Sequence, residues 1–183
     1  DEFFGGPAPK VVLRLRDFVK GQLREFSYRG NDGLFVTEPE YPEEVWDEAI
    51  INALVHRSYS YRNVGIHVRM FDDRFEVVSP GDYPLGVSPD QFISNPRNPH
   101  LMDAMRYLRL VKMMSEGTKR MIASMERVGL PLPEFSPAGR PNVTVVLRND
   151  IYRRSAERGL THIAQTTSFA NLFALRLSAP PPV

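Results

Sequence analysis

The residues best suited to chemistry recur every four positions within the segment 46–57. Glu48, Asn52 and His56 are each one helical turn apart, so they share one flank if the segment is helical. Apolar residues surround most of this helix, which predicts that the flank is partly buried. Burying a carboxylate or an amide costs about 2–7 kcal/mol unless the group is paired. A carboxylate and an amide facing one site suit a metal ion and an activated water.

The same spacing also has a purely structural interpretation. In that interpretation Glu48 is exposed to solvent and Asn52 is an amide that packs between helices. The four histidines are scattered along the chain at spacings that match no zinc site. The helix alone therefore leaves both interpretations open and gives no support to a histidine metal centre.

Bulk composition sets limits on the class of protein. The 183 residues suffice for one domain with a core, and 23 basic residues balance 22 acidic ones. This balance gives no global argument for binding nucleic acid or a membrane. The chain has no cysteine and no apolar run near the roughly 18 residues of a membrane span, so we expect a cytoplasmic location. Because the first residue is Asp1, we expect a fragment of a longer protein.

Apolar periodicity and turn residues predict a mixed order of helices and strands. The expected elements are a helix at 11–26, a loop at 27–41 with a short strand at 34–36, a helix beginning after Pro42, a hairpin at 64–78 that turns at 72–73, an irregular stretch at 79–98, helices from Pro99 and over 116–128, a strand at 142–148 and a weakly patterned part at 149–178. Strands and helices do not alternate regularly, which favours a two-layer α+β sandwich over a doubly wound parallel sheet.

Basic residues concentrate in the two late helices, and they have more than one interpretation. They are Arg106, Arg109, Lys112, Lys119, Arg120 and Arg127. They can form solvated helix faces, an edge that binds phosphate, or a weak contact to nucleic acid. The sequence alone does not decide among these three.

Four blocks of sequence occur in a recognisable order. They are Tyr41-Pro42 with Glu48-Ala49-x-x-Asn52-Ala53-x-x-His56-Arg57-x-Tyr59, the run from Phe71 to Gly81, Asn95-Pro96-Arg97-Asn98-Pro99, and Glu116 to Met121 followed by Gly129-Leu130-Pro131-x-Pro133. Together they resemble a divergent ATPase domain labelled as the C-terminal part of a RecG-like ATP-dependent DNA helicase. That domain follows a Schlafen/AlbA-type DNA-binding domain in bacterial transcriptional regulators. The resemblance covers nearly all of residues 1–148.

The resemblance implies a Bergerat (GHKL) ATPase fold, as in gyrase, the mismatch-repair ATPases and the histidine kinases, with a mixed sheet covered on one face by helices. The chain has no Gly-x-x-x-x-Gly-Lys-Ser/Thr phosphate loop, as expected for that class. The resemblance assigns Glu48 as the catalytic base and Asn52 as the Mg²⁺ ligand, with ATP and Mg²⁺ as cofactors.

The remaining site residues also come from the resemblance. Ser79 and Gly81 stand where Bergerat enzymes carry an Asp-x-Gly-x-Gly turn that recognises adenine, so a hydroxyl replaces a carboxylate. Gly117, Thr118 and Lys119 form the reduced glycine-rich element that would hold phosphate at a helix start. The site is completed by His56 and Asn98.

Two hypotheses of function follow from these observations. In the first, residues 1–148 are an adenine-nucleotide-binding domain that is at most a slow Mg²⁺-dependent ATPase. It would be the regulatory half of a protein that binds DNA through a missing N-terminal domain, and it could form a homodimer. In the second, the fold is degenerate and is kept for dimerisation or ligand sensing. Residues 149–183 would be a C-terminal extension with a disordered tail at 179–183.

Overall fold

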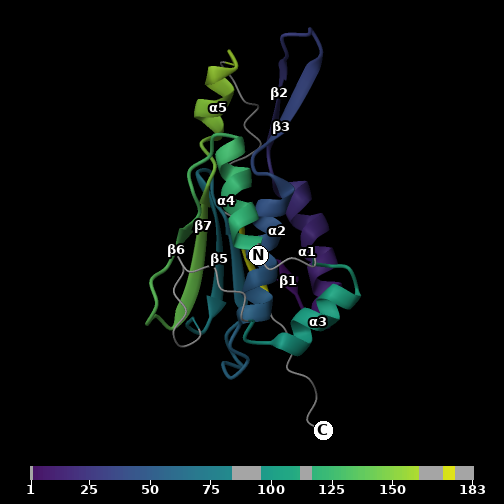
Figure 1. Cartoon of the computed structure of the whole chain (residues 1–183), viewed down its shortest axis with the longest axis vertical. Coiled ribbons are helices and arrows are strands. Elements are labelled where there is room, and N and C mark those ends of the chain that lie inside the picture. Colours follow the sequence, from purple (N-terminus) through teal and green to yellow (C-terminus); the bar gives the residue numbers. More distant parts are fainter. Residues whose placement is uncertain (1, 84–95, 112–116, 161–170, 176–183) are drawn as a thin grey trace.

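The structure is a computed structural model that describes residues 2–83, 96–111, 117–160 and 171–175 and arranges them in two layers (Figure 1). Its helices are α1 (Ala8–Gln22), α2 (Glu43–His56), α3 (Pro99–Tyr107), α4 (Gly117–Arg127) and α5 (Ile151–Glu157). Its strands are β1 (Phe3–Phe4), β2 (Glu25–Arg29), β3 (Phe35–Pro39), β4 (Ile66–Met70), β5 (Arg74–Pro80), β6 (Glu134–Phe135), β7 (Asn142–Arg148) and β8 (Asn171–Leu175).

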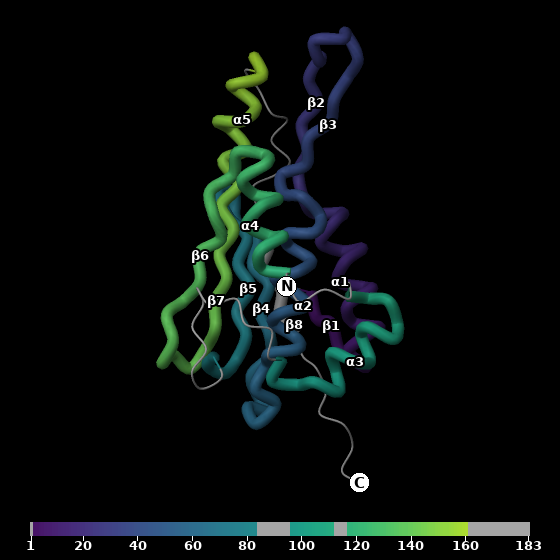
Figure 2. Tube along the Cα trace, viewed as in Figure 1, coloured from purple at the N-terminus to yellow at the C-terminus, as the bar shows by residue number. Residues whose placement is uncertain are grey.

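The main sheet has six strands in the order β1-β8-β4-β5-β7-β6. The β1–β8 pair is parallel and every other neighbouring pair is antiparallel, so the sheet is mixed. Helices α1, α2 and α4 lie across one face of it (Figure 2). These features confirm the predicted two-layer α+β sandwich with helices on one face.

The central hairpin and the strand beside it agree with the sequence patterns. In the β4–β5 hairpin, Met70 pairs with Phe75 across the turn, and the alternating residues Phe75 and Val77 are buried. Strand β7 has the predicted bounds and pairs along the whole length of β5. Period-two alternation was a sufficient signal here because one face of each strand packs against the helices.

The predictions for residues 11–41 were wrong in two places. Helix α1 ends at Gln22 rather than at residue 26, and the expected loop contains an antiparallel hairpin of β2 and β3. Gly21 weakens the last helical turn, whereas Phe26 and Tyr28 alternate with polar residues as strand residues do. Gly33, with φ +81°, makes the tight turn between the two strands.

The C-terminal part contributes to the sheet as well as to the surface. Strand β8 lies between β1 and β4, and its pairing runs from Ile66 opposite Leu175 to Met70 opposite Asn171. Helix α5 stands beside the β2–β3 hairpin at one end of the molecule (Figure 1). The boundary predicted at 148/149 stays a prediction, and the tail 179–183 lies outside the described residues.

Helix α2 is the centre of the core. Pro42 precedes it, and the carboxylates of Glu43 and Glu44 lie in its first turn, where the positive end of the helix favours negative charge. Its buried residues are Val45, Trp46, Ala49, Ile50, Ile51, Ala53, Leu54 and Val55. This confirms the prediction that the helix is buried on most sides, and it leaves one flank for polar residues.

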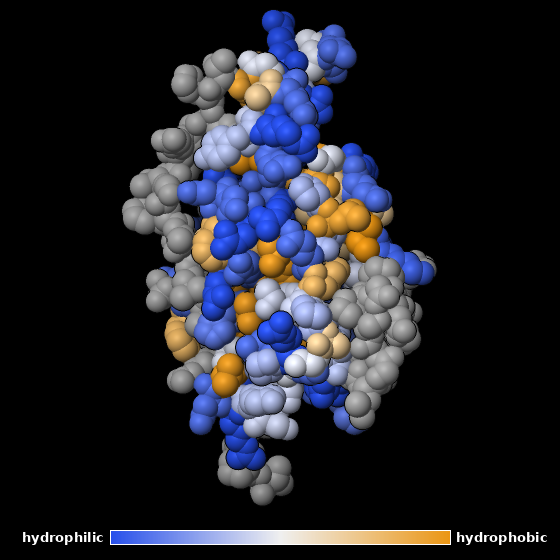
Figure 3. All heavy atoms as spheres, turned by 90° about the vertical axis from the view of Figure 1, so that its left-hand side faces the viewer, coloured by the Kyte–Doolittle hydropathy of each residue, from blue (hydrophilic) through white to orange (hydrophobic). Residues whose placement is uncertain are grey.

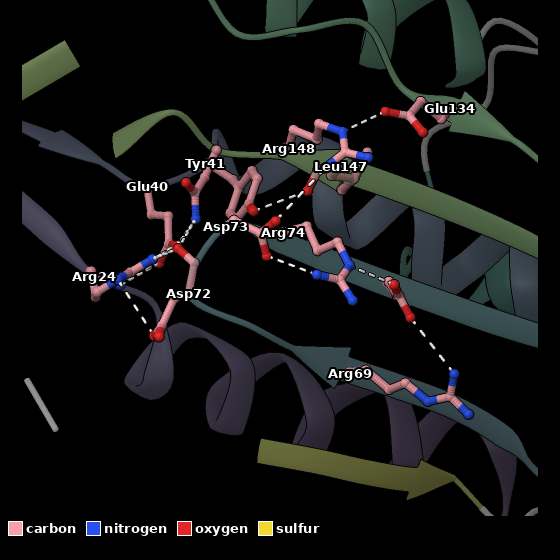
Figure 4. A network of polar contacts seen from close by, with 12 residues as sticks. Arg24, Glu40, Tyr41, Arg69, Asp72, Asp73, Arg74, Glu134, Leu147 and Arg148 are labelled. Atoms are coloured by element: carbon pink, nitrogen blue, oxygen red, sulfur yellow. Dashed lines mark hydrogen bonds and ion pairs between the residues drawn. The ribbon is translucent and has the colours of Figure 1, made fainter. Parts of the chain in front are cut away.

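A polar network with a buried centre fastens the β2–β3 hairpin to the main sheet (Figure 4). The Arg24 guanidinium donates hydrogen bonds to both carboxylate oxygens of Glu40 and to the Asp72 carbonyl. The Asn149 amide donates to Glu40 and to the same Asp72 carbonyl. Glu40 and Asn149 are 3% and 1% exposed, so the centre of the network is buried where it joins the root of the β2–β3 hairpin to the β4–β5 turn and the end of β7.

The surface on the side of β6 and β7 is mainly hydrophilic, with separate hydrophobic areas between the charged side chains (Figure 3). Large exposed apolar side chains occur elsewhere too, at the tip of the β2–β3 hairpin and at the end of α3. They include Leu34, Phe35, Tyr107 and Leu108. No helix in the described part of the chain is long and apolar enough to cross a membrane.

Candidate functional site

Glu48 and Asn52 lie side by side on the free flank of α2. Both residues are half-buried, and the Asn52 side chain hydrogen-bonds the Glu48 carboxylate. A carboxylate only accepts hydrogen bonds, so the amide nitrogen of Asn52 is the donor. The Asn52 Oδ1 oxygen is therefore the atom left to face a cation or a water.

The Glu48 carboxylate lies directly against the start of α4. A Cβ at Gly117 would overlap the carboxylate, so a larger residue there would force the Glu48 side chain to turn away. Arg120, one turn further along α4, places its guanidinium 3.4 Å from Oε2 of Glu48. The carboxylate thus lies between an arginine and the positive end of a helix.

The environment changes the acidity of Glu48. Burial raises the pKa of its carboxyl above the ordinary value, while Arg120 and the hydrogen bond from Asn52 offset part of that rise. A raised pKa makes the carboxylate a stronger base than a solvated glutamate. Such a group, one turn from an amide oxygen, has the properties required of a general base.

The three residues predicted to hold phosphate all lie in the first turn of α4. Gly117 and Thr118 are half-buried, and Lys119 is exposed. Backbone N–H groups in the first turn of a helix have no partner within the helix and suit an anion. The structure therefore brings Glu48, Asn52 and Gly117 together, with Thr118 and Lys119 next to them in the chain.

Ser79 and Gly81 lie further along α2, against its last turns. The Ser79 hydroxyl is buried and donates to the Ala53 carbonyl at 2.9 Å, which leaves its oxygen lone pairs to accept from a ligand. Gly81 has φ +112°, and a Cβ there would lie 2.7 Å from the Cβ of Ser58. Both the backbone conformation and the close packing therefore require glycine at position 81.

Asn98 and His56 meet at the end of α2. The Asn98 amide donates to the carbonyls of Val55 and Arg57 at 3.0 and 2.8 Å, so it caps the helix. Both amide hydrogens are used there, and only the Oδ1 oxygen is left as an acceptor for a ligand. The Arg97 guanidinium donates to the His56 carbonyl at 3.2 Å. Burial lowers the pKa of the His56 imidazole, and the Arg97 charge lowers it further.

The site residues thus form two groups on one helix. Glu48 and Asn52 lie with the start of α4, while His56, Ser79 and Asn98 gather one to two turns away at the end of α2. The irregular stretch expected at 79–98 falls largely on 84–95, which lie outside the described residues. Across the part that is described, no three acidic or histidine side chains gather into a metal site. A Mg²⁺ ion near Asn52 would depend on phosphate and water for its other ligands, as this ion commonly does.

Two arginines also lie near the site; Arg120 was among the basic residues that could form a phosphate-binding edge, whereas Arg97 was not assigned to the site. Arg120 contacts Glu48, and Arg97 binds both the His56 carbonyl and the Asp82 carbonyl. The spacing of Arg120, three residues after Gly117 on a helix, places both on the same face and could have indicated this role. Nothing local to Arg97 signals its contact with a helix end 41 residues earlier in the chain.

Comparison with known proteins gives two findings. Residues 64–147 match the family described as "Putative ATP-dependent DNA helicase recG C-terminal". The match runs from the residues before β4 to β7, so it includes Ser79, Gly81 and the start of α4 but not α2. No functionally curated protein matches the chain.

One solved structure has a similar fold. The crystal structure of the DIP2311 protein from Corynebacterium diphtheriae resembles this fold with a TM-score of 0.68 and 26% sequence identity. The similar region covers 76% of this chain and 29% of that protein, so this chain spans less than a third of its length. Residues 64–147 are thus similar to a RecG C-terminal-type ATPase domain, within a chain whose two-layer fold recurs as one part of a larger bacterial protein.

Proposed function

We propose that this chain binds an adenine nucleotide along α2 and is at most a slow Mg²⁺-dependent ATPase. The observation that carries the proposal is the Glu48–Asn52 pair held against Gly117 at the start of α4. The family match over 64–147 also supports a nucleotide-binding domain. This support does not depend on Glu48 and Asn52, because the matched residues include the turn after β5 and α4 but not α2.

At the phosphate end, each residue has a distinct task. The backbone of Gly117 and Thr118 would bind phosphate oxygens, and Lys119 and Arg120 would add positive charge. Asn52 Oδ1 would hold Mg²⁺, which supplies charge neutralisation at the phosphates. Glu48 would accept a proton from a water as the water oxygen bonds to the terminal phosphorus. The bond from that phosphorus to the bridging oxygen breaks, and ADP leaves with the electron pair.

At the other end, the last turns of α2 would hold the nucleoside. Ser79 offers acceptor lone pairs because its proton is already bonded to Ala53, and an adenine amino group is a donor. Gly81 would shape the turn beside the base, because its positive φ and its close packing on Ser58 fix the backbone there. His56 and the Oδ1 oxygen of Asn98 border the same region.

The wider role in a regulatory DNA-binding protein rests on the resemblance alone. In this proposal the DNA contact belongs to a preceding domain, and the nucleotide domain modulates it, with homodimerisation as one route. The solved relative is more than three times as long as the matched region, which is compatible with such additional parts.

Calorimetric titration of ATP with and without Mg²⁺ tests the proposal. Wild type should bind ATP, with affinity in the high micromolar range because Ser79 offers no charged acceptor. Asn52→Ala should remove most of the gain from Mg²⁺. The matched control is Asn31→Ala in the exposed β2–β3 turn, which should bind like wild type. No heat of binding, together with no thermal stabilisation at millimolar ATP, overturns the proposal.

A second candidate, a fold retained for dimerisation or ligand sensing without nucleotide chemistry, is favoured by one observation. Two polar groups of the site already have partners within the chain, since Glu48 contacts Arg120 and Ser79 donates to the Ala53 carbonyl. If sedimentation shows a dimer while calorimetry shows no nucleotide binding, this candidate replaces the first.

A further inference from the structure

The Glu48 carboxylate occupies the place that a phosphate would need. It lies so close to Gly117 that a single added carbon would overlap it, and Arg120 is its basic partner on α4. Helix α4 has eleven residues, enough for a positive end at its first turn. Carboxylate and phosphate therefore depend on the same two sources of positive charge, and both cannot use them at once.

We propose that Glu48 is an internal competitor for the phosphate end of the ligand, and that Arg120 changes partner from Glu48 to the polyphosphate when the ligand binds. This inference rests on the proposed function, because it describes the regulation of the same site. It adds that the Glu48 carboxylate, when it contacts Gly117 and Arg120, is held in a position where it does not act as a base.

The contact between Glu48 and Arg120 is loose enough to exchange. The Arg120 guanidinium lies 3.4 Å from the Glu48 carboxylate. By contrast, Arg16 of α1 donates two hydrogen bonds of 2.6 and 2.7 Å to Asp47 of α2. The Glu48 and Arg120 side chains are 21% and 33% exposed, so water reaches both. A polyphosphate brings several charges and a geometry that a guanidinium binds with two hydrogen bonds, so it should displace a single carboxylate.

This exchange would couple binding to the position of the base. While Arg120 contacts Glu48, the positive charge favours the ionised carboxylate but keeps it at the helix start. When the phosphate takes Arg120 and the Gly117 backbone, the carboxylate must rotate away from the start of α4, and Asn52 is the partner that it keeps. The ligand thereby releases its own general base, and the empty protein stays inactive.

Titration with inorganic tripolyphosphate in EDTA isolates the phosphate end from Mg²⁺ and from adenine. Glu48→Gln removes the competing charge and should tighten tripolyphosphate binding by about 3- to 10-fold. Arg120→Gln should weaken it by about 10-fold or more. Adenosine, which lacks phosphate, should bind both variants as it binds wild type.

The chain supplies a matched pair of controls on the same two helices. Glu44, one turn before Glu48, pairs with Arg127 at the other end of α4 at 2.9 Å. Glu44→Gln and Arg127→Gln change the same charges at the negative end of that helix, so both should leave tripolyphosphate affinity within about 2-fold of wild type. Circular dichroism of all four variants confirms that the fold is kept.

The outcomes distinguish the proposed competition by Glu48 from the proposed function. If wild type binds ATP and Glu48→Gln binds tripolyphosphate no more tightly, the competition is wrong and the proposed function stands. An equal gain for adenosine also overturns the competition, because the effect is then not on phosphate. If neither wild type nor Glu48→Gln binds ATP or tripolyphosphate, the nucleotide site itself is wrong.

Discussion

Glu40, just before α2, and Glu48, within α2, are held in contrasting ways. Glu40 is 3% exposed and accepts hydrogen bonds from Arg24 (Figure 4). It also accepts one from the Asn149 amide. Glu48 is partly exposed, with one distant arginine and one amide. A fully satisfied carboxylate has no capacity left for a ligand, whereas a partly satisfied one keeps both reactivity and room to move.

The pKa shifts of Arg24 and Glu48 show the same contrast. Burial alone would lower the pKa of the Arg24 guanidinium, but the hydrogen bond and charge of Glu40 outweigh it and raise that pKa. At Glu48 burial is the larger effect, because it raises the pKa of the carboxyl more than the Arg120 charge lowers it. The first pair stabilises the fold at its hairpin root, and the second has the properties of a functional site.

The largest effect should come from breaking the Glu40 network. Arg24→Met leaves a buried carboxylate without its cation, which should lower the free energy of unfolding by about 3–5 kcal/mol. Urea denaturation measures the loss. Lys20→Met is the control, because Lys20 and Glu43 form an exposed pair whose removal should cost less than about 1 kcal/mol. Equal losses in the two variants would contradict the structural role of Arg24.

A smaller effect is expected at Ser79, where a site residue also has a structural bond. Ser79→Ala leaves the Ala53 carbonyl without its donor and should lower the free energy of unfolding by about 1 kcal/mol. It should also weaken adenosine binding, because the acceptor lone pairs are lost. Urea denaturation and adenosine titration of one sample check both parts. Normal adenosine affinity in a destabilised variant would mean that Ser79 only supports α2.

The comparison also shows what the sequence could reveal. The Glu48–Asn52 pair was predictable because helical periodicity alone places residues four apart on one flank. The hairpin β4–β5 and strand β7 were predictable because their alternation is regular and local. The sequence therefore indicated the half of the site that belongs to one helix.

The rest depends on contacts between distant segments. Gly117 touches Glu48 only because α4 packs on α2, and no local pattern specifies that approach. Strand β8 enters the sheet between β1 and β4, a position that a short apolar run cannot reveal. The hairpin at 25–39 was missed because its glycines and exposed residues are also typical of a loop.

The pH dependence of stability tests the other end of the site. The pKa of His56 is lowered in the fold, so its neutral form is favoured. Its contribution to stability is present above the unfolded pKa of about 6.5 and is lost as the pH falls through the lower folded value. His56→Gln should reduce the drop in melting temperature between pH 7.5 and 5.5 by about 1–2 °C. His100→Gln, at an exposed position on α3, is the control and should leave the drop unchanged.

A shift of similar size separates the two glutamates most directly. Because burial raises the pKa of Glu48, the ionised carboxylate destabilises the fold, and that penalty is fully present at neutral pH. Glu48→Gln should therefore raise the melting temperature at pH 7.5 by about 1–3 °C, whereas Glu40→Gln should lower it. The gain should shrink as the pH falls toward the glutamate pKa, where the wild-type carboxyl becomes protonated. Glu44→Gln, which removes an exposed ion pair from the same helix, should give no gain. A loss of stability in Glu48→Gln would place Glu48 with Glu40 among the structural residues.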